Sequence, residues 1–158
     1  MTFKLVFRRE HFDKLMLHLY ADTSREAMAL GYYCVASNDI GQRILVQDVE
    51  LPNEVDYRVK TATRVSLSPQ FLEKIFRRCE NEHVHLLDIH THPWAEGVEF
   101  SAVDDYEARN VKGPYLKKHV LDVNITYVLF GAKPSDARVR IWDHDLGDFH
   151  WAPLIIVW

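Results

Sequence analysis

Two histidines that lie two positions apart are the residues of this sequence that most clearly suggest a chemical role. Four histidines fall in the ten residues 83–92, and the last two of them are His90 and His92. Because side chains two apart on a β-strand lie on one face, these imidazoles would point the same way. Neutral imidazoles bind zinc, which in a catalytic site takes three protein ligands and leaves a fourth position for water. The spacing therefore predicts two ligands of a zinc ion.

Asp104 is the expected third ligand. Ser101 is a favourable N-cap residue, and a helix that begins there would carry Asp104 in its first turn. The loop 93–100 would have to fold back over a short distance to bring this turn to the end of the histidine strand. A shift of one residue would exchange the roles of Asp104 and Asp105, and the Ser-x-x-Asp spacing favours Asp104.

The string HTHPWAEGVEFSAVDD resembles the defining motif of the JAMM/MPN (JAB-domain) metallopeptidases, which is His-x-His-Pro, a loop, and Ser-x-x-Asp. The resemblance implies that His90, His92 and Asp104 hold one zinc ion with a bound water. It spans most of the chain, because the expected helices, hairpin and strands come in the family's order. Two departures stand out. Eight residues separate His92 from Ser101 where the family usually has seven, and Ala29 replaces a frequent glycine.

The same family has a catalytic glutamate between its first helix and the next strand, and Glu26 holds that place here. The resemblance implies that Glu26 accepts a proton from the attacking water and returns it to the leaving amine. Glu50 is the main rival for this role. Ser101 resembles the family serine that helps to stabilise the tetrahedral oxyanion, although residue chemistry alone fits an N-cap equally well.

Several neighbours of the motif have two interpretations. Asp88 shares the expected strand face with the two ligands, so it is either a partner of a ligand histidine or part of the polar lining of the strand. Trp94 either lines a substrate groove or packs on the domain. His83 and His85 are expected to be structural, because one strand cannot bring all four histidines to a single ion.

The apolar pattern predicts one mixed α/β domain over residues 1–158, with a mixed sheet flanked by helices, and the resemblance implies the cytidine-deaminase-like fold of MPN/JAB domains. Helices are expected at 9–20, at 69–80 behind an N-cap at Ser68, and at 103–110, where the last stops before Gly113-Pro114. Strands are expected at 3–7, 27–36, 43–51, 59–67, 83–92, 125–131, 137–142 and 154–158, and the second and third form a hairpin.

Composition excludes several classes of protein. The net charge of -4, with scattered basic residues, argues against a nucleic-acid surface. No stretch reaches the roughly 20 apolar residues of a membrane helix, and the N-terminus does not resemble a signal peptide. Cys34 and Cys79 are expected to be buried, reduced thiols. Together these features predict a cytoplasmic protein.

The resemblance implies a zinc-dependent metallopeptidase or isopeptidase that cleaves at the C-terminal tail of ubiquitin or a ubiquitin-like protein. E1- and E2-like proteins are candidate partners, and an extended tail could add to a sheet edge beside the zinc. A non-catalytic MPN scaffold and a RadC-like hydrolase are the alternatives. The string DIHTHP also matches the opening of amidohydrolase barrels, but only about 70 residues follow it. A closed barrel of that kind takes about 250 residues.

Overall fold

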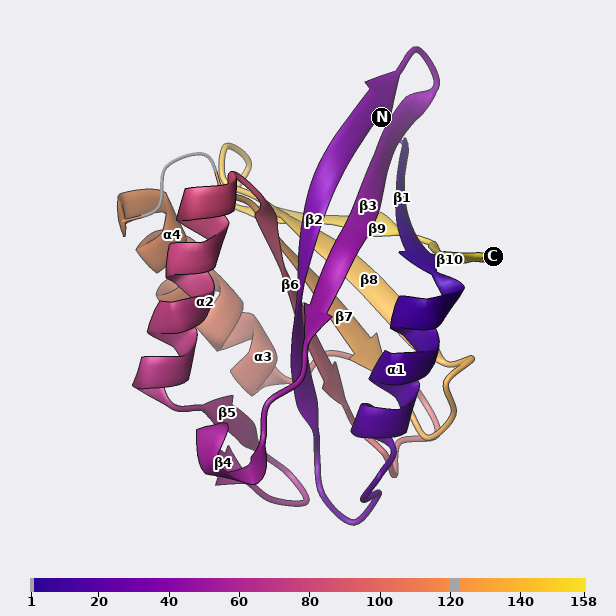
Figure 1. Cartoon of the computed structure of the whole chain (residues 1–158), viewed down its shortest axis with the longest axis vertical. Coiled ribbons are helices and arrows are strands. Elements are labelled where there is room, and N and C mark those ends of the chain that lie inside the picture. The colour runs from indigo at the N-terminus through magenta and orange to yellow at the C-terminus, as the bar shows by residue number, and fades with distance from the viewer. Residues whose placement is uncertain (1, 120–122) are drawn as a thin grey trace.

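The computed structural model describes residues 2–119 and 123–158, and its main feature is an eight-stranded mixed sheet with helices on both faces (Figure 1). The strands are β1 (Thr2–Arg8), β2 (Met28–Asn38), β3 (Gly41–Glu50), β4 (Tyr57–Lys60), β5 (Val65–Leu67), β6 (His85–Thr91), β7 (Ile125–Phe130), β8 (Ala137–Asp143), β9 (Asp148–Ala152) and β10 (Leu154–Val157). The helices are α1 (Arg9–Leu19), η1 (Glu54–Asp56), α2 (Pro69–Glu82), α3 (Ala102–Glu107), η2 (Ala108–Lys112) and α4 (Gly113–His119). The predicted mixed α/β class is confirmed.

The strand order in the large sheet is β10-β1-β3-β2-β6-β7-β8-β9. Strand β2 is antiparallel to β3 and to β6, so the N-terminal hairpin joins the C-terminal half of the sheet along β6. Strands β6 and β7 are parallel, and β7, β8 and β9 continue as an antiparallel meander. The histidine strand β6 therefore lies in the middle of the sheet, with a neighbour on each side.

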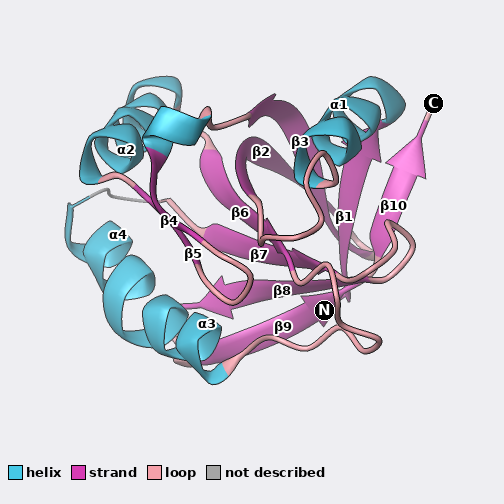
Figure 2. Ribbon diagram, turned by 90° about the horizontal axis from the view of Figure 1, so that it is seen from below, coloured by secondary structure: helices cyan, strands magenta, loops and turns pink. Residues whose placement is uncertain are grey.

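The two faces of the sheet bury separate apolar clusters. Helix α1 covers one face, and α2, α3 and α4 lie on the other (Figure 2). Along β6, Leu87 and Ile89 belong to the α1 cluster, whereas Leu86 belongs to the α2 cluster. Because strand side chains alternate, His90 shares the face of Leu86. The predicted common face of the histidines thus lies beneath the helices that follow them in the chain.

Helix α2 has the predicted start. The Ser68 hydroxyl accepts a hydrogen bond from the backbone N–H of Phe71 at 3.2 Å, and Pro69 occupies the first helical position. Phe71, Ile75 and Cys79 form the buried face. The helix ends at His83, whose φ of 54° lies in the left-handed region. The expected strand 83–92 consequently begins only at His85.

Replacing His83 with glycine is expected to raise the free energy of unfolding by about 0.5–1 kcal/mol. A residue with a Cβ costs roughly 1–2 kcal/mol in the left-handed conformation, and glycine is the usual residue at this helix end. Urea denaturation of His83→Gly and His83→Ala would measure the effect, because alanine keeps the Cβ and gains nothing. Equal stability of the two variants would contradict the explanation.

The expected single strand at 59–67 is wrong. The structure divides this region into β4 and β5, which pair antiparallel as a separate two-stranded sheet. A tight turn separates them, in which the N–H of Thr61 donates to the carbonyl of Arg64 at 2.8 Å. The β-forming residues on both sides of this turn concealed it in the sequence.

The predicted end of the third helix before Gly113 is also wrong. The π-helical segment η2 continues α3, and α4 continues η2 through Pro114. In η2, the N–H of Gly113 donates to the carbonyl of Ala108, five residues back. Pro114 then falls in the first turn of α4, where a missing N–H is tolerated. Gly113 is required there, because an added Cβ would lie 2.7 Å from that same carbonyl.

The expected burial of both cysteines needs correction. Cys79 is buried but Cys34 is exposed, and both are free thiols. Burial along β2 stops after Tyr33, because the β2–β3 hairpin extends beyond the rest of the sheet (Figure 1).

Strand β9 was not predicted, and it forms one edge of the large sheet. Among the helices in the described part of the chain, none is long and apolar enough to cross a membrane.

Candidate metal centre

Antiparallel pairing of β2 with β6 brings Glu26 to the histidines. Met28 is the register partner of His90, and the same register continued by two residues sets Glu26 opposite His92. The backbone between them supports this continuation, because the N–H of Thr91 donates to the carbonyl of Ala27 at 3.0 Å. Directly opposed residues share a face of the sheet. The carboxylate of Glu26 accordingly lies 3.5 Å from Nε2 of His92.

The start of α3 brings Asp104 to the same place. Ser101 caps the helix: its hydroxyl accepts from the Asp104 N–H at 3.2 Å, and its own N–H donates to Asp104 Oδ2 at 2.6 Å. The predicted N-cap is confirmed. Asp104 Oδ1 lies 3.3 Å from His90 Nε2, and Oδ2 lies 3.6 Å from His92 Nε2. The neighbouring Asp105 is directed to Arg140.

The three side chains fit a metal ion. One ligand atom from each of His90, His92 and Asp104 lies within 4.8 Å of the others. Two ligands at 2.0–2.1 Å from a tetrahedral zinc are about 3.3 Å apart, which is close to the separations found. Nε2 of His90 is buried, and its 3.3 Å contact with Asp104 lacks the geometry of a hydrogen bond, so no hydrogen bond from the described residues satisfies it. A buried polar atom without a partner costs free energy, and a bound cation would remove that cost. The cluster could therefore hold a metal ion.

The electrostatics of the cluster suit a cation. Burial would raise the pKa of Asp104, but the adjacent imidazole of His90 and the Ser101 donors outweigh it and hold that pKa well below its ordinary value. Burial and the neighbouring His90 lower the pKa of His92. Metal binding needs ionised carboxylates and neutral imidazoles, and these shifts favour the ionised form of Asp104 and the neutral form of His92. Glu26 differs, because burial raises its pKa to about 7.

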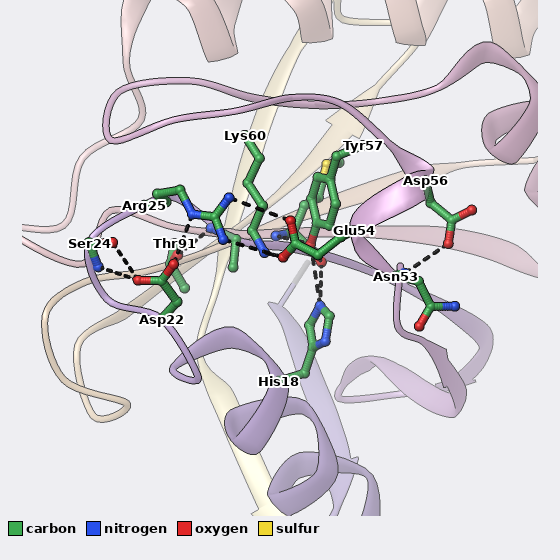
Figure 3. Close-up of polar contacts among 12 residues, drawn as sticks. His18, Asp22, Ser24, Arg25, Asn53, Glu54, Asp56, Tyr57, Lys60 and Thr91 are labelled. Carbon is green, nitrogen blue, oxygen red and sulfur yellow. Dashed lines mark hydrogen bonds and ion pairs between the residues drawn. The ribbon is translucent and has the colours of Figure 1, made fainter.

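A network of ion pairs fixes the segment that carries Glu26 (Figure 3). The guanidinium of Arg25 donates to Asp22 at 2.8 Å and reaches Glu54 at 3.4 Å. The N–H of Glu26 itself donates to the carbonyl of Thr61 at 2.8 Å. The turn before β2 is thus held against η1 and the β4–β5 hairpin. Sequence reasoning did not identify the contacts with Glu54 and Thr61, because these partners lie about 30 positions away in the chain.

The side chains of Tyr57 and His18 both contact the backbone carbonyl of Met28, where β2 begins. The Tyr57 hydroxyl donates to the carbonyl of Met28 at 2.9 Å, and Nε2 of His18 lies 3.0 Å from the same oxygen (Figure 3). Burial raises the pKa of Tyr57 and lowers that of His18. Both side chains therefore favour their neutral forms and fix the start of β2 near its partner His90.

Contacts in the structure show what surrounds the other residues near the motif. Trp94 stacks on His92, with ring centroids 6.0 Å apart and planes 18° apart, and its side chain is half exposed. It therefore lies beside the candidate site. Asp88 lies 2.5 Å from the ammonium of Lys112, so its ion-pair partner is a lysine and not a ligand histidine. Glu50, the rival base, contacts Lys74 in α2 at 2.5 Å.

The remaining histidines of the cluster have other surroundings. His83 ends α2, and Nδ1 of His85 accepts a hydrogen bond from the backbone N–H of Asn124 at 3.0 Å. Neither belongs to the group of side chains that could hold a metal. Near the C-terminus, His150 lies 2.8 Å from Asp143. The expectation that one strand supplies only two histidines to the site agrees with this geometry.

Comparison of the chain with known proteins does not identify its family. No protein-family model matches the chain, and no curated protein matches it. What the structure supports is a mixed α/β fold in which His90, His92 and Asp104 are close enough to bind one metal ion.

Proposed function

We propose that this protein is a zinc-dependent metallopeptidase or isopeptidase of the JAMM/MPN type. The observation that carries the proposal is a set of three possible metal ligands with a buried glutamate beside it, which could act as a base. Three ligand atoms from His90, His92 and Asp104 cluster within 4.8 Å, and a fourth side chain, Glu26, is buried beside them. Two imidazoles and one carboxylate are a common ligand set for catalytic zinc, with one position left for water.

The side chains at this site have different roles in amide hydrolysis. Zinc at this site would lower the pKa of water towards neutrality and polarise the substrate carbonyl. Glu26 accepts the proton of the attacking water and delivers it to the leaving amine. In the metal-free protein burial raises the pKa of Glu26 to about 7, so this carboxyl group can take up a proton near neutral pH. His90, His92 and Asp104 would hold the metal, and the ring of Trp94 stacks on that of His92.

The substrate we propose is the C-terminal tail of ubiquitin or a ubiquitin-like protein, cut at a peptide or isopeptide bond. Support comes from the resemblance of the His-x-His-Pro and Ser-x-x-Asp strings to the JAMM motif. The cytidine-deaminase-like topology of that family is part of the same proposal, and so are E1- and E2-like partners. The order of the site residues along the chain, glutamate before histidines before aspartate, agrees with it.

The test is a cleavage assay on a panel of ubiquitin-like proteins, each carrying a short C-terminal extension. Zinc-loaded protein is expected to remove the extension, a chelator to stop the reaction, and added zinc to restore it. Zinc content is measured in the same preparation. Protein that binds no zinc would favour a non-catalytic scaffold. Zinc-bound protein that cuts none of the tails would overturn the substrate class and leave the metal site standing.

Ser101 is expected to have two separable roles. Ser101→Ala should lower the free energy of unfolding by about 0.5–2 kcal/mol, whereas Ser101→Asn should keep the stability, because asparagine is also a good N-cap. Ser101→Ala should also lose about 10²-fold in kcat, because alanine has no group that can donate to the oxyanion. Denaturation and turnover measured together separate the roles. Full activity in Ser101→Ala would leave Ser101 with the capping role alone.

A further inference from the structure

The helix that carries Asp104 has few apolar contacts to hold it in place. Helix α3 has no buried residue, and η2 buries only Ala108. Helix α2 on the same face, by contrast, buries Phe71, Ile75 and Cys79. A catalytic metal needs its ligands held to within a fraction of an ångström. Something other than apolar packing must therefore fix the position of α3.

A row of polar residues crosses the sheet beneath this helix. Asp88 on β6 is the register partner of Tyr127 on β7, which in turn is the partner of Arg140 on β8. Register partners on adjacent strands share a face, so the three side chains form one line. Asp88, Tyr127 and Arg140 are 2%, 4% and 4% exposed. The row has a negative end and a positive end, and both are buried.

The helical segment carries the complementary charges. Lys112 in η2 lies 2.5 Å from Asp88, and Asp105 in α3 accepts a hydrogen bond from Arg140. Nε and Nη2 of Arg140 have no hydrogen-bond partner among the described residues. Asp105 therefore supplies the only hydrogen bond that the structure gives to this buried guanidinium, which also packs between the rings of Phe100 and Phe149.

The order of the charges on the helical segment matches that on the sheet. Two steps between adjacent strands amount to about 10 Å, which separates Asp88 from Arg140. Asp105 and Lys112 are seven residues apart in the chain, and Asp105 meets Arg140 while Lys112 meets Asp88. A reversed helix would put Lys112 over Arg140 and Asp105 over Asp88. Both contacts would then join like charges, so the two pairs define one direction for the helix.

These ion pairs adjoin the metal cluster directly. Asp105 follows the ligand Asp104 in the chain, and a cavity of about 20 Å³ has Asp88, Lys112, Tyr127, His90 and Asp104 in its wall. A movement of the helix that lengthened either ion pair would also move Asp104 relative to His90. Ion pairs and ligands therefore form one connected unit.

We propose that the ion pairs Asp88–Lys112 and Asp105–Arg140 are positioning contacts, which orient the α3–η2 segment so that Asp104 meets the two strand histidines. The inference rests on the proposed metal site. It adds four residues that act through Asp104 and do not touch the metal themselves. These two pairs hold the segment to the middle of the sheet next to Asp104, and Arg109 adds hydrogen bonds to Gly147 and Asp148 at the sheet edge.

The test measures zinc affinity by competition with a chromogenic chelator, together with the free energy of unfolding of the metal-free protein. Asp105→Asn, Arg140→Gln and the double variant form a cycle, and Arg77→Gln, which breaks an exposed pair with Glu73, is the control. Each single variant is expected to lose about 10–100-fold in zinc affinity. The double variant should bind zinc no more weakly than the weaker-binding single variant, because both substitutions remove the charge attraction of the same pair. Arg77→Gln should bind zinc like the wild type.

A merely structural role would lower the stability of the metal-free protein and leave the zinc affinity of the folded protein unchanged. That result in Asp105→Asn would overturn the inference. Asp105 is half exposed, so this variant is expected to fold even if Arg140→Gln does not. A wild-type protein that takes up no zinc would overturn the proposed function and the inference together. Zinc binding by the wild type with unchanged affinity in Asp105→Asn overturns the inference alone.

Discussion

Glu26→Gln is expected to lower kcat for tail cleavage by about 10²–10⁴-fold while the zinc content stays that of the wild type. The amide has nearly the shape of the carboxyl group but cannot accept the proton of the attacking water. Glu26 is not one of the three clustered ligands, so the metal should remain bound. The measurements are steady-state turnover of a fusion substrate and zinc per chain by atomic absorption.

Glu50→Gln is the matched control, because Glu50 is the other glutamate that the sequence proposes as the base. It contacts Lys74 and Arg78 in α2 and not the histidines, so this variant should keep its turnover. Normal cleavage by Glu26→Gln would show that the base is elsewhere. Loss of zinc from Glu26→Gln would instead make Glu26 a fourth ligand.

Asp104→Asn is expected to weaken zinc binding by more than about 100-fold, which exceeds the usual cost of changing a contact outside the ligand set. The substitution removes the only anionic ligand of the cluster and replaces it with a weak neutral oxygen. The backbone capping contacts with Ser101 can persist, because asparagine also accepts a hydrogen bond from the Ser101 N–H. Chelator competition gives the affinity, and circular dichroism of the metal-free protein reports the fold.

Asp13→Asn is a suitable control for Asp104→Asn, because Asp13 lies on α1 and pairs with the surface residue Arg9. It should bind zinc like the wild type. If Asp104→Asn keeps wild-type affinity while Asp105→Asn loses zinc altogether, the two aspartates have exchanged roles and the assignment of the third ligand is wrong.

The parts of the fold that depend on local rules could be predicted from the sequence. The cap at Ser68 and the apolar face of α2 are examples, since both arise from residues within one or two turns of each other. The turn between β4 and β5 was missed, because β-forming residues stand on both sides of it. The π-helical segment η2 was missed as well. Its passage through Gly113-Pro114 depends on a bond to Ala108 and on the side chain of Trp142 close by.

At the candidate site, the sequence by itself determined that His90 and His92 share a face and that Ser101 places Asp104 in the first turn of a helix. Both follow from the repeat of side-chain direction, which is two residues in a strand and 3.6 residues in a helix and depends only on the local backbone. Only the tertiary structure decided the rest. The β2–β6 register put Glu26 beside His92, and the contacts of Asp88 and Arg140 placed the helix so that Asp104 met His90. These outcomes depend on pairings between residues 24 to 66 positions apart, whose partners no local pattern specifies.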